Sequence, residues 1–152
     1  GCNLTESIKS FANKINKNTC AILVEPIQGE AGIRVPDKGW LKELRKLCDK
    51  ENILLILDEI QSGLGRTGKL FAYEHSHIQP DGLILGKALG GGFMPVSCFL
   101  TSEEVLHWMN PGSHGSTFGG NPLAMSVGNK VMDVVSNKKF LNNIKKQSKY
   151  FL

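Results

Sequence analysis

Short, unbroken apolar runs that each end in a reactive side chain are the feature that most constrains the fold of this chain. Three runs have this form: residues 20–24 before Glu25, residues 53–57 before Asp58, and residues 82–85 before Gly86-Lys87. Their length and β-branched content favour strands buried on both faces. A further run, residues 96–100, is predicted to form a fourth strand.

Helical patterns lie between and after these runs. Trp40, Leu41, Leu44, Leu47 and Cys48 form an apolar stripe at helical spacing. Three helix starts are predicted from capping residues: Asn3 with Glu6, Thr101 with Glu104 in a helix through Trp108, and Asn121 followed by Pro122. Apolar strands that alternate with helices predict an α/β fold, with a mainly parallel sheet covered by helices on both faces.

A parallel sheet directs attention to one of its edges. Ligands of open α/β sheets bind beyond the carboxyl ends of the strands. We therefore expect Glu25, Asp58 and Lys87 to lie at a common edge. Charges next to buried strands are costly to desolvate without partners, which favours a shared site over three separate structural residues.

The composition excludes several classes of protein. The 152 residues are 41% apolar, enough for a buried core. No apolar run approaches the roughly 18 residues of a membrane helix, which indicates a soluble protein without a membrane partner. The net charge of +4 does not indicate nucleic-acid binding. Five lysines after residue 135 carry the excess without aromatic residues for stacking, as on a solvated helix face: Lys138, Lys139, Lys145, Lys146 and Lys149.

The cysteine and histidine patterns predict no metal site. Cys2, Cys20, Cys48 and Cys98 lack the spacing of a zinc site or a disulfide framework. Free thiols are typical of a reducing compartment, so we expect a cytoplasmic protein. His75, His77 and His107 match no metal-ligand pattern.

Two phosphate-binding motifs match the sequence only in part. Residues 63–68 fit GxGxxG, but Glu59 to Ser62 separate them from the preceding strand and little helical pattern follows. Residues 63–69 approach a P-loop, but Leu70 replaces the hydroxyl that would bind magnesium. Neither a dinucleotide-binding enzyme nor an ATPase is therefore favoured.

Lys87 and Asp58 favour a different chemistry. A lysine in a confined pocket between glycines can form a Schiff base with a carbonyl. A carboxylate such as Asp58 favours protonation of a heterocyclic nitrogen beside it. Together they form the arrangement that pyridoxal phosphate enzymes require. Gly115-Ser116-Thr117 offers hydroxyls and backbone N–H groups for the phosphate.

At this point the sequence resembles a known family. Five motifs are similar to those of the class III aminotransferases, in the same order: Glu25-Pro-Ile-Gln-Gly-Glu30, Asp58-Glu-Ile-Gln61-Ser-Gly, Gly65-Arg-Thr-Gly68, Gly86-Lys87-Ala-Leu-Gly-Gly and His114-Gly-Ser-Thr117-Phe-Gly-Gly-Asn-Pro122. The resemblance implies pyridoxal 5'-phosphate as cofactor. It also implies part of the large domain of fold type I.

The resemblance implies a role for each matching residue. Lys87 would bond to the cofactor and move a proton, and Asp58 would pair with the pyridine nitrogen. Gln61 would bond the phenolic oxygen. Ser116 and Thr117 would hold the phosphate, with Thr117 reaching the partner's cofactor in a homodimer. The implied substrate-binding residues are Glu25, close to cofactor and substrate, and Glu30, which would shield a substrate-binding arginine.

The implied reaction is a ping-pong transfer between an amino acid and a 2-oxo acid. Leu85-Gly-Lys87-Ala-Leu and Pro95-Val-Ser97 are more similar to the ornithine branch of the family than to the acetylornithine branch. That branch moves the δ-amino group of ornithine to 2-oxoglutarate, which gives glutamate semialdehyde and glutamate. An acetylornithine or related ω-amino acid substrate is the alternative.

The chain also departs from the family. We expect residues 1–152 to be the central part of the large domain, without the N-terminal segment and the C-terminal small domain. The small domain would supply the arginine for a substrate carboxylate, so the segment alone should be inactive. A truncated, non-catalytic remnant is the alternative of another class.

Overall fold

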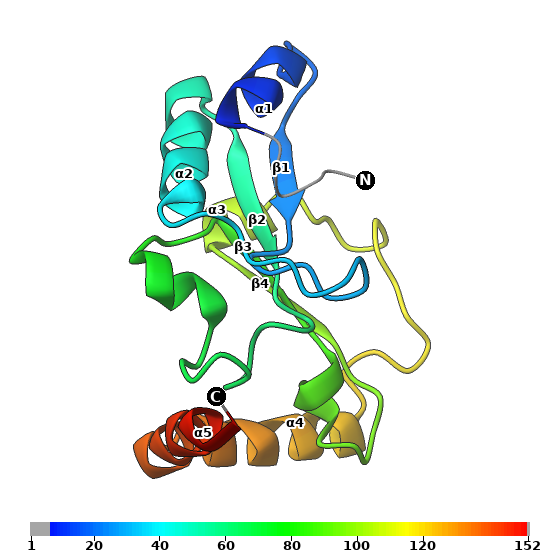
Figure 1. Cartoon of the computed structure of the whole chain (residues 1–152). Helices are drawn as coiled ribbons and strands as arrows, with labels where there is room; N and C mark the ends of the chain where they lie inside the picture. Colours follow the sequence, from blue (N-terminus) through cyan, green and yellow to red (C-terminus); the bar gives the residue numbers. More distant parts are fainter. Residues whose placement is uncertain (1–6, 152) are drawn as a thin grey trace.

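The computed structural model describes residues 7–151. The elements follow one another as α1 (Ile8–Lys14), β1 (Ala21–Val24), α2 (Trp40–Glu51), β2 (Leu54–Asp58), the 3₁₀ helix η1 (Ala72–Ser76), β3 (Gly82–Leu85), the 3₁₀ helix η2 (Lys87–Gly90), β4 (Cys98–Thr101), α3 (Glu103–Leu106), α4 (Pro122–Val135) and α5 (Lys138–Phe151) (Figure 1). All four predicted strands are present, each shifted by no more than two residues.

The described residues form one sheet of four strands in the order β1-β2-β3-β4. β1 pairs with β2 and β2 with β3 in parallel, whereas β3 and β4 are antiparallel. The prediction of a mainly parallel sheet with helices is confirmed. The last strand reverses direction because the segment between Leu85 and Cys98 contains only η2 and a glycine-rich loop, without a crossover α-helix.

The two faces of the sheet differ in how well they are covered. Leu55 and Leu57 of β2 are fully buried on the face against which α2 packs. α1 packs on α2, where the rings of Phe11 and Trp40 meet edge to face at 5.9 Å. On the opposite face Leu23 is 58% exposed. The core therefore lies between the sheet and the α1–α2 pair.

The predicted helix starts have three different outcomes. Asn121 caps α4 as predicted, because its side-chain oxygen accepts a hydrogen bond from the Ala124 N–H at 2.9 Å. The cap expected at Thr101 is wrong. Thr101 ends β4 and donates to the Asp81 carbonyl, while Ser102 caps α3, which ends at Leu106 rather than Trp108. The Asn3–Glu6 cap and Cys2 lie outside the described residues.

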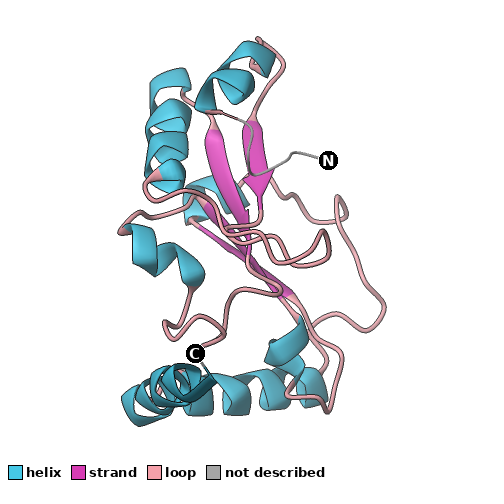
Figure 2. Ribbon diagram, in the orientation of Figure 1, coloured by secondary structure: helices cyan, strands magenta, loops and turns pink. Residues whose placement is uncertain are grey.

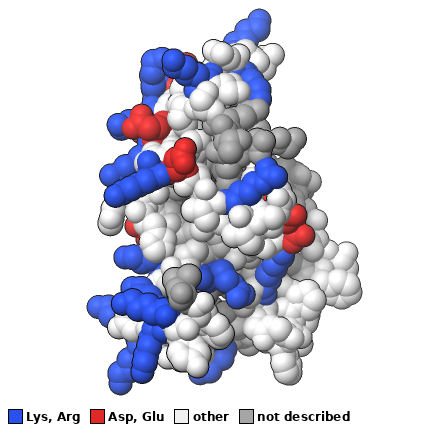
Figure 3. Space-filling view, viewed as in Figure 1, with Lys and Arg blue, Asp and Glu red and all other residues white. Residues whose placement is uncertain are grey.

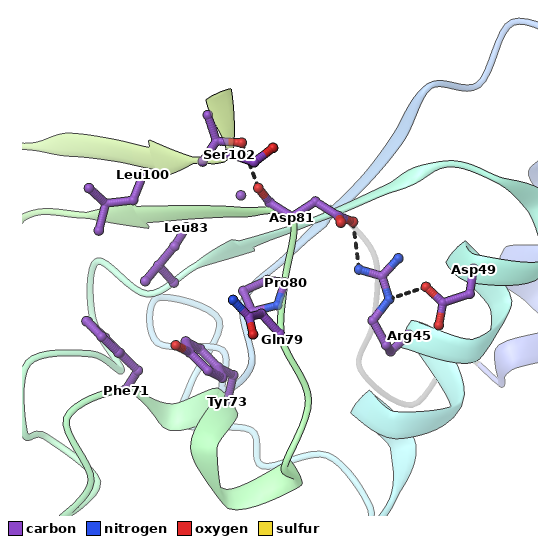
Figure 4. A pocket seen from close by; sticks show the side chains of 12 residues that line it. Arg45, Asp49, Phe71, Tyr73, Gln79, Pro80, Asp81, Leu83, Leu100 and Ser102 are labelled. Carbon is purple, nitrogen blue, oxygen red and sulfur yellow. Dashed lines mark hydrogen bonds and ion pairs between the residues drawn. The ribbon is translucent and has the colours of Figure 1, made fainter. Parts of the chain in front are cut away.

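An ion pair joins α2 to the start of β3. Arg45 lies between two carboxylates, with Nη1 2.6 Å from Asp81 and Nε 2.8 Å from Asp49 (Figure 4). The same Asp81 oxygen accepts a hydrogen bond from the Leu55 N–H at 2.7 Å. Asp81 therefore connects α2, β2 and β3 at the end of the sheet opposite the strands' carboxyl ends.

The terminal helix carries the basic excess predicted from the sequence. Lys and Arg side chains gather over α5 at the lower left of the molecule (Figure 3). No helix within residues 7–151 has the length and apolar character needed to cross a bilayer.

The Asp81 contacts predict unequal effects of two matched substitutions. Asp81→Asn should lower the free energy of unfolding by about 1–3 kcal/mol, because it weakens hydrogen bonds of a half-buried carboxylate. Asp49→Asn should cost less than about 1 kcal/mol, since this carboxylate is exposed. Urea unfolding of both variants tests the difference, and equal losses would contradict the connecting role of Asp81.

Candidate functional site

The carboxyl ends of the three parallel strands meet at one edge of the sheet, as predicted. Glu25 follows β1, Asp58 ends β2, and Lys87 opens η2 one residue after β3. The segments that follow these strands are mostly loops (Figure 2). α4 packs against η2 below this edge (Figure 1). The fold therefore gathers the three residues within one region.

Lys87 has an unusual backbone conformation. Its φ is +44°, in the left-handed region that residues other than glycine seldom adopt. Hydrogen bonds from Leu89 N–H to the Gly86 carbonyl and from Gly91 N–H to the Ala88 carbonyl hold the turn. Such a conformation persists only where its surroundings fix it, and it is concentrated at functional sites.

Glu30 joins Lys87 to Gln61. Its Oε1 accepts a hydrogen bond from Gln61 Nε2 at 2.5 Å and lies 3.3 Å from Lys87 Nζ. The Lys87 side chain is 54% exposed and that of Glu30 87%, so this ion pair contributes little to stability. It does show that the motifs around residues 30, 61 and 87 meet in space.

Glu25 has a local role in the same region. Its carboxylate accepts a hydrogen bond from the Gly29 N–H at 3.0 Å and so closes the turn that leads to Glu30. A Cβ at Gly29 would overlap the Gln61 side chain. The described contacts of Glu25 therefore organise the turn rather than reach Lys87.

The Asp58 carboxylate is half-buried at the end of β2. Its Oδ1 accepts a hydrogen bond from the Ile60 N–H at 3.0 Å. This bond fixes the side chain against the turn that follows the strand.

Two grooves flank Lys87. One, of about 490 Å³, is lined by Lys87, Gln61, Ile60, Gly29, Arg66 and Thr67. The other, of about 640 Å³, is lined by Lys87, Ile60, His114, Ser116, Phe118 and Asn121. Both volumes lie in the range of small-molecule sites. The fold thus brings Ser116 to the Lys87 region, while the neighbouring Thr117 is exposed outside the residues that line these two grooves.

The donor set fits pyridoxal phosphate. In type, an amine, a carboxylate, an amide and a hydroxyl match its carbonyl carbon, ring nitrogen, phenolic oxygen and phosphate. Lys87 lines both grooves, Gln61 one and Ser116 the other, whereas Asp58, at the end of the neighbouring strand, lines neither. Ile60 lines both grooves and offers an apolar surface for a flat ring. Among residues 7–151, no three His, Cys, Asp or Glu side chains cluster as metal ligands would.

The glycine-rich loop after β2 does not open a helix. Its Gly65 and Gly68 have positive φ, and the next helical element, η1, begins only at Ala72. Side chains of α5 pack against it, with Ile144 beside Gly65 and Lys145 beside Gly68. As the sequence predicted, the motif therefore lacks the directly following helix that a dinucleotide fingerprint requires.

Sequence reasoning missed Glu59. This side chain is 1% exposed, and its carboxylate accepts hydrogen bonds from the Ala72 and Tyr73 N–H groups at 2.6 and 2.9 Å. Burial raises the pKa of Glu59, against the effect of these hydrogen bonds. The period of two in a strand could have indicated it, since Glu59 follows Leu57 toward the buried face.

Comparison with known proteins agrees with the geometry. The sequence model of the family Aminotransferase class-III matches residues 2–152. The chain is 61% identical over 128 residues to "Ornithine aminotransferase 2" of Staphylococcus saprophyticus, covering 84% of this chain and 32% of that protein. It is 51% identical over 144 residues to ornithine aminotransferase of Macrococcus caseolyticus, covering 95% and 36%.

Solved structures give a similar result. An ornithine aminotransferase of Plasmodium yoelii superposes with a TM-score of 0.83 at 47% identity, covering 89% of this chain and 36% of that one. An acetylornithine aminotransferase of Elizabethkingia anophelis gives 0.82 at 53% identity, covering 86% and 33%. The chain thus spans about a third of the length of these relatives.

The loop after Asp58 predicts a strict need for glycine at position 63. A Cβ there would lie 2.8 Å from the Glu59 carbonyl oxygen, whereas a Cβ at Gly90 would have no such neighbour within 3.8 Å. Gly63→Ala should lower the free energy of unfolding by about 1–3 kcal/mol, and Gly90→Ala should change it by less than about 1 kcal/mol. Denaturant titration measures both, and a neutral Gly63→Ala would contradict the packing described here.

Proposed function

Because this chain belongs to the class III aminotransferases, we propose that it forms the central, cofactor-binding part of an ornithine aminotransferase. The observation that carries the proposal is Lys87. It lies at the carboxyl end of a parallel strand, in a fixed left-handed turn, and lines two grooves at once. The ornithine aminotransferases at 51% and 61% identity support the choice of substrate.

The chain's own residues would hold the cofactor as follows. Lys87 Nζ would bond covalently to the carbonyl carbon of pyridoxal phosphate, with loss of water. Asp58 would keep the ring nitrogen protonated, and Gln61 would donate to the phenolic oxygen. Ser116 and Thr117 would bind the phosphate. When bound, pyridoxal phosphate supplies an electron sink that stabilises negative charge on the substrate carbon.

Lys87 would also perform the proton transfer. Its Nζ, when free of the cofactor, would remove a proton from the δ-carbon of ornithine. Glu25 and Glu30 would bind on the substrate side, and the contacts of Glu30 with Lys87 and Gln61 support this role. The bound cofactor would carry the amino group between two half-reactions. Water would replace that group on ornithine, which gives glutamate semialdehyde. 2-Oxoglutarate would then take up the amino group with release of water, which gives glutamate.

A second substrate remains a candidate. The acetylornithine aminotransferase of known structure is 53% identical to this chain, more than the 47% of the Plasmodium yoelii enzyme. Acetylornithine or a related ω-amino acid would use the same lysine and carboxylate. Comparing kcat/KM for ornithine and acetylornithine decides between the two substrates.

A homodimer is part of the proposal. Large apolar side chains are exposed around the loop that contains Thr117: Phe93, Trp108, Phe118 and Leu123. Exposed apolar patches of this kind are typical of interaction surfaces. A second copy covering this loop would bring Thr117 to the partner's cofactor.

A cytoplasmic location is also part of the proposal. The free Cys20, Cys48 and Cys98 fit the reducing environment of the cytoplasm.

The cofactor link predicts that Lys87→Ala abolishes the visible absorbance of bound pyridoxal phosphate. Lys130→Ala, on the exposed surface of α4, should retain it. Absorbance spectra of the full-length protein after removal of free cofactor test both variants. Retention of the band in Lys87→Ala would show that another lysine holds the cofactor.

The dimer predicts complementation between two inactive variants. A mixed dimer of Lys87→Ala and Thr117→Val chains contains one site with both lesions and one site with neither, if Thr117 acts across the interface. Co-purified mixed dimers should then recover about half of the wild-type activity per dimer. If Thr117 served its own subunit, each site would carry one lesion and no recovery would occur.

A further inference from the structure

Glu59 is the buried charged residue that the proposed chemistry leaves without a role. Among the described residues, it is the one charged side chain in the buried class. Burying a carboxylate is costly unless hydrogen bonds compensate for the lost water. Glu59 has them: its two carboxylate oxygens accept hydrogen bonds from the N–H groups of Ala72 and Tyr73. The structure thus maintains a costly arrangement directly beside Asp58.

The backbone of Glu59 is fixed as firmly as its side chain. Its N–H donates to the Ile84 carbonyl of β3 at 2.9 Å, and its carbonyl accepts from the Gly63 N–H at 2.9 Å. The carboxylate crosses the base of the loop to η1, thirteen residues along the chain. One residue therefore joins the end of β2 to the strand that precedes Lys87 and to the far end of the glycine-rich loop.

The groups placed by these bonds are those of the candidate site. Asp58 precedes Glu59, and Gln61 follows it by two residues. Arg66 and Thr67, which line the groove beside Lys87, belong to the loop that the Glu59 carboxylate closes. A displacement of Glu59 would move both of these segments relative to Lys87.

We propose that Glu59 is a positioning residue for cofactor binding: its buried carboxylate holds Asp58 and Gln61 in register with Lys87 by tying the end of β2 to η1. This inference rests on the proposed function, since it concerns the residues that would bind pyridoxal phosphate. Glu59 would not touch the cofactor itself and would act through Asp58 and Gln61.

Glu59→Gln is the direct variant, because it keeps the size of the side chain. The amide NH₂ group then faces either the Ala72 or the Tyr73 N–H, and one of these donors loses its acceptor. Glu74→Gln is the matched control. Glu74 lies in η1, the 3₁₀ helix to which the Glu59 carboxylate is bonded, and it accepts a hydrogen bond from the Phe71 N–H at 2.8 Å. This bond is local to η1 and does not reach the end of β2.

The experiment uses the full-length protein loaded with pyridoxal phosphate. Three quantities are measured: the melting temperature, the rate of cofactor release, and the pH midpoint of the visible absorbance band. We expect Glu59→Gln to release cofactor about tenfold faster and to shift the midpoint. Glu74→Gln should keep wild-type values of both, even where its melting temperature falls.

The outcomes distinguish a role of Glu59 in positioning the cofactor-binding residues from a contribution to folding stability alone. A Glu59→Gln protein that melts earlier but keeps the wild-type release rate and midpoint would overturn the inference alone. A wild-type protein that binds no pyridoxal phosphate would overturn the proposed function together with it. If Glu59→Gln does not fold, Glu59→Asp keeps the charge but shortens the side chain, which draws the carboxylate away from the Ala72 and Tyr73 N–H groups. Faster release from this variant supports positioning, and unchanged release and midpoint contradict it.

Discussion

The parallel pairing of β1, β2 and β3 is the constraint on which the rest of the structure depends. Parallel strands end at the same edge of the sheet, so the strand pairing alone brings together residues that are far apart in the sequence. The apolar pairs Leu23–Ile56 and Val24–Leu57 set the register. Glu25, Asp58 and Lys87 are brought together by this register, and the grooves beside Lys87 follow from it.

Polar groups at this edge are stabilised mainly by neighbouring backbone and side chains. Asp58 and Glu25 each accept a nearby backbone N–H, and Glu30 is shared between Gln61 and Lys87. Glu59, the buried member, accepts two backbone N–H groups. The carboxylates of this edge thus range from the buried Glu59 to the exposed Glu30.

Patterns of adjacent residues predicted the strands and the start of α4, because these features depend mainly on neighbouring residues. The apolar runs gave all four strands, and Asn121-Pro122 gave the start of α4, because both signals depend on adjacent residues. Ser102 replaced Thr101 as a cap because Thr101 is held in β4 by its bond to the Asp81 carbonyl, a contact between distant segments. Glu59 was missed for the same reason, since its partners lie thirteen residues away. The antiparallel direction of β4 likewise depends on tertiary structure.

The covalent link between Lys87 and pyridoxal phosphate is the central claim, and chemical trapping tests it most directly. Borohydride reduction of the loaded full-length protein fixes a lysine-bound cofactor, and peptide mass spectrometry then locates it. We expect the added mass on the peptide that contains Lys87 and on no other lysine-containing peptide of the chain. Added mass on a different lysine, or none at all, would contradict it.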